Sequence, residues 1–274
     1  MESVTSLDVR VGDRVVRAHD SGEQGRAVVL WHHGTPQTGF PIEPVARAAR
    51  ATGVRVLSYG RPGYGGSTRQ PGRQVVSAAV DAAAVADAFG VDRFCVVGAS
   101  GGGSHALGCA AGLGDRVFAA VAFAAPAPWS DAFDWYGGMV APQALRAGRS
   151  GLAAREAVTP EFDPDSFVEA DYELLAGPWG EMGRDAQRAG REGGGGEVDD
   201  DVAFAGDWGV DFAAVRTPVL LVQGGLDRVV PPDHGRHLAA LLPHAELWYR
   251  PDDGHVSILR ELPEALEWAL RHLA

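Results

Sequence analysis

Lysine and asparagine are absent from this chain of 274 residues, so arginine supplies all of its basic side-chain charge apart from histidine. The formal net charge is −12, and the acidic residues are spread along the chain instead of being gathered in a tail. Such a surface repels the phosphate backbone of nucleic acids and the anionic face of a membrane. We therefore expect neither a nucleic acid nor a membrane as a partner.

Cysteine is almost absent as well, with Cys95 and Cys109 as the two copies. The first falls in a predicted central strand and the second in the helix that follows, which favours small buried hydrophobic side chains over a disulfide. No metal-ligand cluster, phosphate loop or dinucleotide fingerprint occurs in a suitable context, and the glycine-rich GYGGS lacks the lysine of a nucleotide-binding loop. The sequence therefore predicts no metal and no cofactor.

Long apolar runs are missing too, since no stretch of the sequence approaches the roughly 20 residues of a membrane-spanning helix. The opening residues MESVTSLDVRVGDRVVR carry acids and arginines where a secretory signal has an apolar core. These two absences predict a cytoplasmic protein. The hydrophobic content of 46% is nevertheless enough for the sizeable core of a globular enzyme.

Short β-branched runs alternate with longer alanine-rich segments along the chain. This pattern is typical of an α/β fold with a mostly parallel central sheet flanked by helices. A turn at Gly12 and Asp13 predicts an opening hairpin of 7–10 with 14–18. The remaining strands are predicted at 27–32, 54–59, 93–97, 117–124, 219–223 and 246–250. The helices are predicted at 43–51, 74–89, 101–111, 233–241 and 256–273.

The composition changes between residues 126 and 209, where many of the aromatic residues and the run GREGGGGEVDDD occur. We predict an inserted subdomain there, which leaves 1–125 and 210–274 as the core. The glycines at 193–196 favour a mobile loop or hinge, because glycine runs do not hold a rigid element. Three consecutive acids at 199–201 cannot all face one ion in a regular element. They therefore predict a solvated face or a helix N-terminus.

The stretch CVVGASGGGS, residues 95–104, sets one serine among glycines directly after an apolar run. A strand that ends at Gly98 and a helix that begins near Gly101 leave Ser100 at the apex of a sharp, strained turn. Gly98 and Gly102 lack the Cβ atoms that would collide as the strand and the helix approach each other. This GxSxG pattern predicts a nucleophile elbow, with the serine hydroxyl above the carboxyl ends of the strands, where open α/β sheets bind ligands.

A serine hydroxyl is a weak nucleophile until a histidine takes its proton and an acid orients that histidine. Asp227 follows the strand at 219–223 in GGLDRVVPP, and His255 follows the next strand in PDDGH, so both lie at the same sheet edge as Ser100. Asp252 and Asp253 are alternative acids, but they are too near His255 in sequence to reach its far ring nitrogen easily. Five other histidines fall in segments predicted as surface strand, helix or turn: His19, His234, His237, His244 and His272.

Attack on a carbonyl also requires hydrogen-bond donors for the oxyanion that develops. One predicted donor is the backbone N–H of Gly101, immediately after the nucleophile. The other is expected from the segment HHGTP, residues 32–36, with the N–H of Thr35 first and that of Gly34 next. We interpret His33 as a brace of this loop whose ring bonds to the backbone.

These segments together resemble the α/β-hydrolase superfamily over essentially the whole chain: HHGTP, RPGYGGS at 61–67, GASGG, GGLDRVVPP and DGH. The resemblance implies that residues 126–209 form a mainly helical cap over the active site. It also implies that side chains of the cap line the substrate pocket, although each of them could instead belong to the core of the cap. The candidates for substrate binding are Trp129, Trp135, Tyr136, Met139 and Trp179.

The identity of the nucleophile narrows the expected chemistry. Relatives that open epoxides or displace halide use aspartate at the elbow, whereas Ser100 favours acyl transfer through an acyl-enzyme. The loop HGTP lacks the doubled glycine and proline usual in proline-releasing aminopeptidases, so a peptidase is not favoured. We interpret the chain as a hydrolase of carboxylic esters, with a small to medium, largely apolar molecule as its substrate.

Two alternatives stay open at this point. One is a natural-product tailoring enzyme that uses the same three residues for C–C bond cleavage or a reaction without net hydrolysis. The other is a ligand-binding receptor on this scaffold, against which the complete set of Ser100, Asp227 and His255 argues. Neither the identity of the substrate nor the oligomeric state follows from the sequence.

Overall fold

The computed structural model describes residues 4–273 and contains one eight-stranded sheet with the strand order β1-β2-β4-β3-β5-β6-β7-β8. The strands are β1 (Thr5–Val11), β2 (Arg14–Asp20), β3 (Val28–His32), β4 (Arg55–Tyr59), β5 (Phe94–Ala99), β6 (Val117–Phe123), β7 (Val219–Gly224) and β8 (Ala245–Arg250). Strand β2 of the hairpin β1/β2 pairs antiparallel with β4, and β3 and β5 to β8 run parallel to β4. The predicted fold class and the opening hairpin are confirmed.

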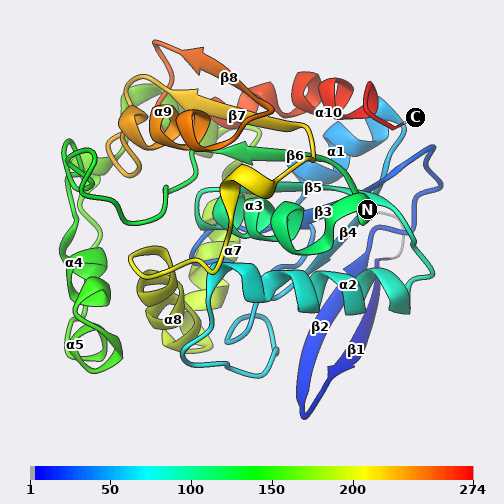
Figure 1. Ribbon diagram of the computed structural model, residues 1–274, viewed down its shortest axis with the longest axis horizontal. Coiled ribbons are helices and arrows are strands. Elements are labelled where there is room, and N and C mark those ends of the chain that lie inside the picture. The colour runs from blue at the N-terminus through cyan, green and yellow to red at the C-terminus, as the bar shows by residue number, and fades with distance from the viewer. Residues whose placement is uncertain (1–3, 274) are drawn as a thin grey trace.

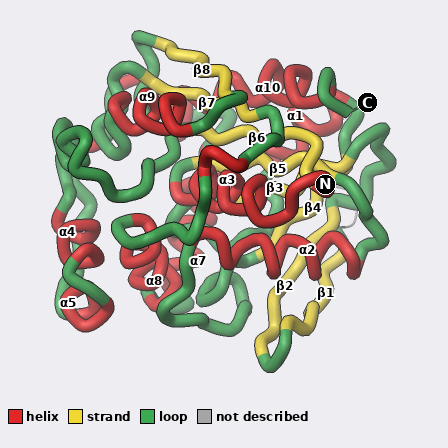
Figure 2. The backbone as a smooth tube through the Cα atoms, viewed as in Figure 1, coloured by secondary structure: helices red, strands yellow, loops and turns green. Residues whose placement is uncertain are grey.

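Helices cover both faces of this sheet, as Figure 2 shows in red around the yellow strands. One face packs against α2 (Ala78–Ala88), α3 (Gly101–Leu113) and α9 (Pro232–Leu241), and the other against α1 (Glu43–Thr52) and α10 (Leu262–Leu270). Neighbouring residues of β5 point to opposite faces, so Val96 joins the first hydrophobic cluster and Val97 the second. Because β5 is buried on both faces, its sequence is a continuous apolar run, and this run is what predicts the strand.

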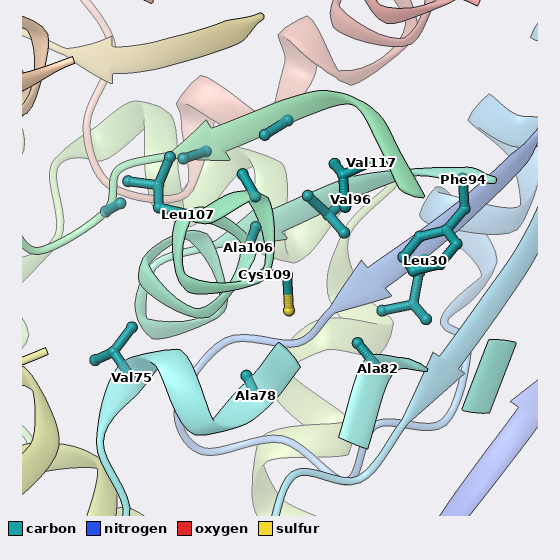
Figure 3. Close-up of a cluster of buried hydrophobic side chains, with 14 of the residues drawn as sticks. Leu30, Val75, Ala78, Ala82, Phe94, Val96, Ala106, Leu107, Cys109 and Val117 are labelled. Carbon is teal, nitrogen blue, oxygen red and sulfur yellow. The ribbon is translucent and has the colours of Figure 1, made fainter. Parts of the chain in front are cut away.

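The first hydrophobic cluster contains one of the two cysteines. Figure 3 shows Ala106 and Cys109 of α3 close to Val96 of β5 and Ala78 of α2. Cys95 of β5 lies in the second cluster, and both cysteines are buried and unbonded to each other. The prediction that they are small buried hydrophobic side chains is confirmed.

Two predicted helices differ from the structure where each begins. The segment predicted at 74–89 starts as the 3₁₀ turn η1 (Val75–Ser77) before α2, and the segment predicted at 256–273 starts as η5 (Ser257–Glu261) before α10. Pro263 explains the second break, because proline has no N–H to continue a helix yet fits its first turn.

The long connection between β6 and β7 is mainly helical. It contains α4 (Gln143–Arg149), α5 (Leu152–Glu156), η3 (Pro164–Ser166), α6 (Glu169–Ala176), α7 (Gly180–Arg191), α8 (Gly195–Phe204) and η4 (Phe212–Ala214). Figure 1 shows α4, α5 and α8 at the left, on the side toward which the arrow of β6 points. We call residues 126–209 the insertion. None of the helices in residues 4–273 combines the length and the hydrophobicity needed to cross a membrane.

The three consecutive acids of the insertion are buried in α8, so the predicted solvated face is wrong. Asp199 pairs with Arg73 at 3.1 Å, Asp200 pairs with the same arginine at 2.7 Å, and Asp201 pairs with Arg155 at 2.6 Å. A buried carboxylate is tolerated when cations and hydrogen bonds satisfy it. Arg73 is 126 residues from Asp199 in the sequence, so no local sequence pattern predicts that contact.

The glycine run is a loop only in its first half, since Gly193 and Gly194 are exposed residues ahead of α8. Gly195 and Gly196 form the start of α8, and a Cβ atom on Gly196 would lie 2.6 Å from a ring carbon of Tyr64. A Cβ atom on Gly63 would in turn lie 2.7 Å from the Cα atom of Gly196. The absence of side chains thus permits close packing of the insertion on the loop after β4, which corrects the prediction of a mobile loop or hinge for Gly195 and Gly196.

Candidate active site

Ser100 lies at the sharp turn between β5 and α3 and has a φ of 54° and a ψ of −128°. A non-glycine residue with this backbone conformation is strained, and such strain clusters at functional sites. A Cβ atom on Gly98 would overlap the carbonyl oxygen of Gly102, and one on Gly102 would overlap that of His32. The predicted reason for these two glycines is therefore confirmed.

The structure brings Ser100, His255 and Asp227 together. The Nε2 atom of His255 lies 3.1 Å from Oγ of Ser100, and its Nδ1 atom lies 2.8 Å from Oδ2 of Asp227. The other carboxylate oxygen of Asp227 accepts the N–H groups of Val229 and Val230 at 2.9 and 2.8 Å. A carboxylate on Nδ1 keeps the proton there, so the lone pair of Nε2 points at the serine hydroxyl.

Asp253, one of the alternative acids, points elsewhere. It pairs with Arg260 at 3.3 Å, and no hydrogen bond joins it to the ring of His255 within the described residues. The carboxylate that contacts the ring of His255 is thus Asp227, the acid that the sequence favours.

Opposing effects act on the pKa of His255. Burial alone would lower this pKa, but the negative charge of Asp227, its hydrogen bond and the charge of Asp171 raise it, and the net result lies above the ordinary 6.5. These carboxylates therefore stabilise the imidazolium that forms when the ring accepts a proton.

The candidate oxyanion donors do not all remain available. The N–H of Gly34 donates to Oε1 of Gln37 at 2.8 Å, which corrects its assignment as a donor to substrate. Gly101 is the first residue of α3, where N–H groups have no partner inside the helix. Within residues 4–273, no hydrogen bond from the N–H of Gly101 or Thr35 to another group is found. A Cβ atom on Gly101 would lie 2.7 Å from Oγ1 of Thr35, so the two residues are close neighbours.

His33 braces the loop, as predicted. The N–H of Arg61 donates to its Nε2 atom at 3.0 Å, so the proton of the ring sits on Nδ1 and is donated to the carbonyl oxygen of Gly34 at 2.7 Å. Burial and the nearby charge of Arg61 hold the pKa of His33 well below 6.5, so the ring is neutral.

Sequence reasoning missed the buried carboxylate beneath Thr35. Asp200 accepts hydrogen bonds from Oγ1 of Thr35 at 2.7 Å and from Arg61 at 2.6 Å through Oδ2, and from Arg73 at 2.7 Å through Oδ1. The Tyr64 hydroxyl donates to Oδ2 at 3.0 Å. Burial raises the pKa of Asp200, but the two guanidinium groups outweigh it and hold this pKa well below 3.8. The insertion thus fixes the loop that carries one candidate oxyanion donor.

Two histidines predicted in surface segments are in fact buried, namely His19 and His234. The Nδ1 atom of His234 accepts the N–H of Ala127 at 3.0 Å, so its Nε2–H donates to the carbonyl oxygen of Trp135 at 2.9 Å. This ring therefore ties α9 to the first residues of the insertion. Its hydrogen-bond partners are backbone groups, which no sequence pattern marks, so the burial of His234 could not be predicted from the sequence.

A cavity of about 710 Å³ opens beside Ser100 and His255. Most of its wall is apolar and comes from the insertion, including Leu145 of α4, Phe167, Leu175 of α6, Met182 of α7 and Phe204 of α8. A cavity of this size and character suits a small organic molecule.

None of the five predicted substrate-binding residues lies in the wall of that cavity, which corrects the expectation. Trp135 is buried and donates its Nε1–H to the carbonyl oxygen of Ala127 at 3.0 Å, and its ring packs on Trp129 and Tyr136. Met139 lies in the same segment, and Trp179 packs into the hydrophobic cluster on the α1 and α10 face. Large aromatic rings stabilise cores by their area, and here these rings serve the packing of the insertion.

Comparisons with known proteins agree with this architecture. Residues 27–262 match the sequence model of a family described as alpha/beta hydrolase fold. A bromoperoxidase from Bacillus anthracis has 23% identity and a TM-score of 0.75, with 98% of this chain and 100% of that chain covered. An esterase from Exiguobacterium antarcticum has 18% identity and a TM-score of 0.73, with 98% and 99% covered. An enol-lactonase from Burkholderia xenovorans LB400 has 20% identity and a TM-score of 0.70, also with 98% and 99% covered. At these identities the likeness concerns the fold.

Proposed function

The chain belongs to the α/β-hydrolase family, and on that premise we propose that it hydrolyses carboxylic esters of small to medium, largely apolar molecules through an acyl-enzyme. The observation that supports this most directly is the sequence of contacts from Ser100 through His255 to Asp227, at 3.1 and 2.8 Å. Nucleophile and base within hydrogen-bond reach, with the base oriented by an acid, is the arrangement that activates a serine.

The reaction proceeds in two halves. Nε2 of His255 takes the proton of Ser100 as Oγ attacks the ester carbonyl carbon, and the N–H groups of Gly101 and Thr35 stabilise the oxyanion. The imidazolium then protonates the leaving alcohol, and an acyl-enzyme ester remains on Ser100. Water attacks that ester with His255 again acting as base, which releases the acid and restores the serine. Asp227 stabilises the imidazolium in both halves.

In this proposal residues 126–209 act as the cap, and the core consists of 1–125 with 210–274. The cap supplies most of the apolar wall beside Ser100, so it selects substrates by the size and shape of their apolar part. The partner of the site is thus a small molecule, and neither a metal nor a cofactor takes part in the steps above.

We expect a serine-directed fluorophosphonate to add one covalent adduct to the protein, visible as a mass increase of the intact chain. The adduct forms because an activated serine attacks phosphorus as it attacks a carbonyl carbon. The same preparation should hydrolyse p-nitrophenyl esters, with kcat/KM rising from acetate toward medium acyl chains as more apolar surface is buried in the cavity. A folded protein that takes no label and turns over no ester would contradict the proposed function.

Ala144 of α4 lies in the cavity wall, so the substitution Ala144→Phe should shorten the acyl chain that the site accepts. We expect kcat/KM for an octanoate ester to fall about 10- to 100-fold while that for acetate changes little, because only the longer chain meets the added ring. The matched control is Gln143→Phe, at the preceding and exposed position of the same helix. Equal losses for both esters in Ala144→Phe would place the acyl chain elsewhere.

A further inference from the structure

One buried carboxylate of the insertion lies directly under the loop that carries His255. Asp171 of α6 accepts the backbone N–H of His255 through Oδ2 at 3.2 Å, and those of Val256 and Ser257 through Oδ1 at 2.9 and 2.6 Å. Its Oδ2 atom also accepts the N–H of Val168, in its own segment, at 3.1 Å. Asp171 is fully buried, so these four N–H groups replace water as its hydrogen-bond partners.

The loop is shaped to receive this carboxylate. Ser257 opens the turn η5, and N–H groups at the start of a helical turn have no partner within it. A Cβ atom on Gly254 would overlap Oδ2 of Asp171, so the glycine of the DGH segment lets the loop approach the carboxylate. The N–H of Gly254 donates instead to Oγ of Ser257 at 2.7 Å, which closes the turn.

The charge of Asp171 is not cancelled by a neighbouring cation. Within the described residues no arginine or histidine side chain lies at ion-pair distance from it. Two other carboxylates lie near the loop: Asp227 bonds to the ring of His255, and Asp253 pairs with the half-exposed Arg260 at 3.3 Å. Asp171 therefore contributes a negative charge that acts on the imidazole from the backbone side. Among the described residues, no cation at ion-pair distance offsets this charge.

We propose that Asp171 is a positioning residue for the reaction, supplied by the insertion, which holds the His255 loop so that the imidazole stays in reach of Ser100. This inference rests on the proposed function. The three backbone bonds fix His255, Val256 and Ser257 together, and the distance of 3.1 Å between Nε2 and Oγ depends on that loop. The same carboxylate also helps to raise the pKa of His255. The insertion thus contributes to the chemistry as well as to the walls of the cavity.

A simpler role, docking of the insertion on the core, can be separated by comparison with a second buried carboxylate. Asp185 of α7 accepts the N–H and the hydroxyl of Thr38 at 2.9 and 2.7 Å. It docks the insertion with bonds of the same kind, but it does not contact the loop of His255. Its substitution by asparagine is therefore a matched control for Asp171→Asn.

The experiment compares Asp171→Asn and Asp185→Asn with the wild type in the full-length protein. Asparagine keeps the shape of the side chain, but it removes the charge and puts an NH₂ group where an oxygen accepted N–H groups. For Asp171→Asn we expect kcat for a p-nitrophenyl ester to fall about 10- to 100-fold with little change in KM, because misplacement of the base affects the chemical step. The pKa of His255 should fall, as measured by NMR titration of its imidazole and assigned with His255→Ala. Asp185→Asn should leave that pKa unmoved.

The NMR titration is decisive because docking alone would not move it. A folded Asp171→Asn protein whose His255 keeps the wild-type pKa would overturn the proposal, whatever its activity. An equal fall of that pKa in Asp185→Asn would also overturn it, because loosening of the whole insertion would then be the cause. If the wild type neither hydrolyses esters nor takes the fluorophosphonate label, the proposed function fails. The two titrations still decide whether Asp171 acts on His255.

Discussion

Ser100→Ala is expected to lower kcat for p-nitrophenyl ester hydrolysis on the order of 10⁶-fold and to abolish labelling by the fluorophosphonate. The substitution removes the attacking oxygen, and no other hydroxyl bonds to Nε2 of His255 within the described residues. Any residual hydrolysis comes from the remaining oxyanion donors and from substrate binding. Intact-mass analysis and steady-state kinetics of the purified variant measure both effects.

The fold should survive this substitution. Alanine and serine are strained to a similar degree at a φ of 54°, and the lost hydroxyl makes one hydrogen bond, at 3.1 Å. We therefore expect the midpoint of urea unfolding to shift little, so the loss of activity reports on chemistry. A Ser100→Ala protein that still labels and turns over at the wild-type rate would remove Ser100 from the mechanism.

Ser104→Ala is the matched control for this prediction. Ser104 is a buried serine in the first turn of α3, and its hydroxyl donates to the carbonyl oxygen of Pro126 at 2.9 Å, away from His255. Its loss should cost about 1 kcal/mol of stability and leave the fluorophosphonate adduct in place. A loss of labelling in both variants would indicate misfolding instead of the absence of a nucleophile.

The residues at the strand ends could be placed from the sequence because the sheet supplies a rule. The strands before Ser100 and Asp227 are buried apolar runs, and the strand before His255 is the partly exposed AELWYR at the edge of the sheet. All three run parallel, so their carboxyl ends lie at one edge of the sheet. Local sequence patterns were therefore enough to predict that three residues distant in the sequence lie close together.

No comparable rule predicts the residues that hold the loops at this edge of the sheet. Asp200 is 139 residues from Arg61 in the sequence, and Asp171 is 84 residues from His255, so each contact depends on how the insertion folds back onto the core. A run of acids reads as a solvated face until the positions of its arginine partners are known. The prediction that the aromatic residues of the insertion bind substrate was wrong for a related reason. The area of Trp135 makes it valuable both for a pocket and for a core, and its environment in the fold decides between them.

Asp200→Asn is expected to be the most destabilising of the substitutions considered. The fully buried carboxylate pairs with Arg61 at 2.6 Å and Arg73 at 2.7 Å, and both arginines are themselves almost entirely buried. Removing the charge leaves two guanidinium groups facing a neutral amide, and breaking a buried ion pair from one side costs about 3–5 kcal/mol. Urea unfolding, followed by tryptophan fluorescence, measures the loss as a lower midpoint at an unchanged slope.

The pH dependence of that loss has a definite sign. The pKa of Asp200 is held well below its ordinary value, so its contribution to stability is complete above about 3.9, the usual pKa of an unfolded aspartate. The contribution disappears only as the pH falls from there through the lower pKa of the folded state. The difference in unfolding free energy between wild type and Asp200→Asn should thus be constant from pH 5 to 8 and should narrow in stronger acid. A gap that widened in acid would contradict the assignment.

Asp233→Asn provides the control at the surface. Asp233 pairs with Arg236 at 2.7 Å, but both side chains are more than half exposed, so the pair is screened by water and salt. We expect its loss to change the unfolding free energy by less than about 1 kcal/mol. Asp200→Asn should also lower kcat in the protein that remains folded. The amide has one acceptor oxygen where the carboxylate has two, so it cannot keep the hydrogen bonds of both Thr35 and Arg73, and the candidate oxyanion loop loosens. Equal stability of the two variants would mean that water reaches the arginines around α8, and a full kcat would mean that Thr35 is held without Asp200.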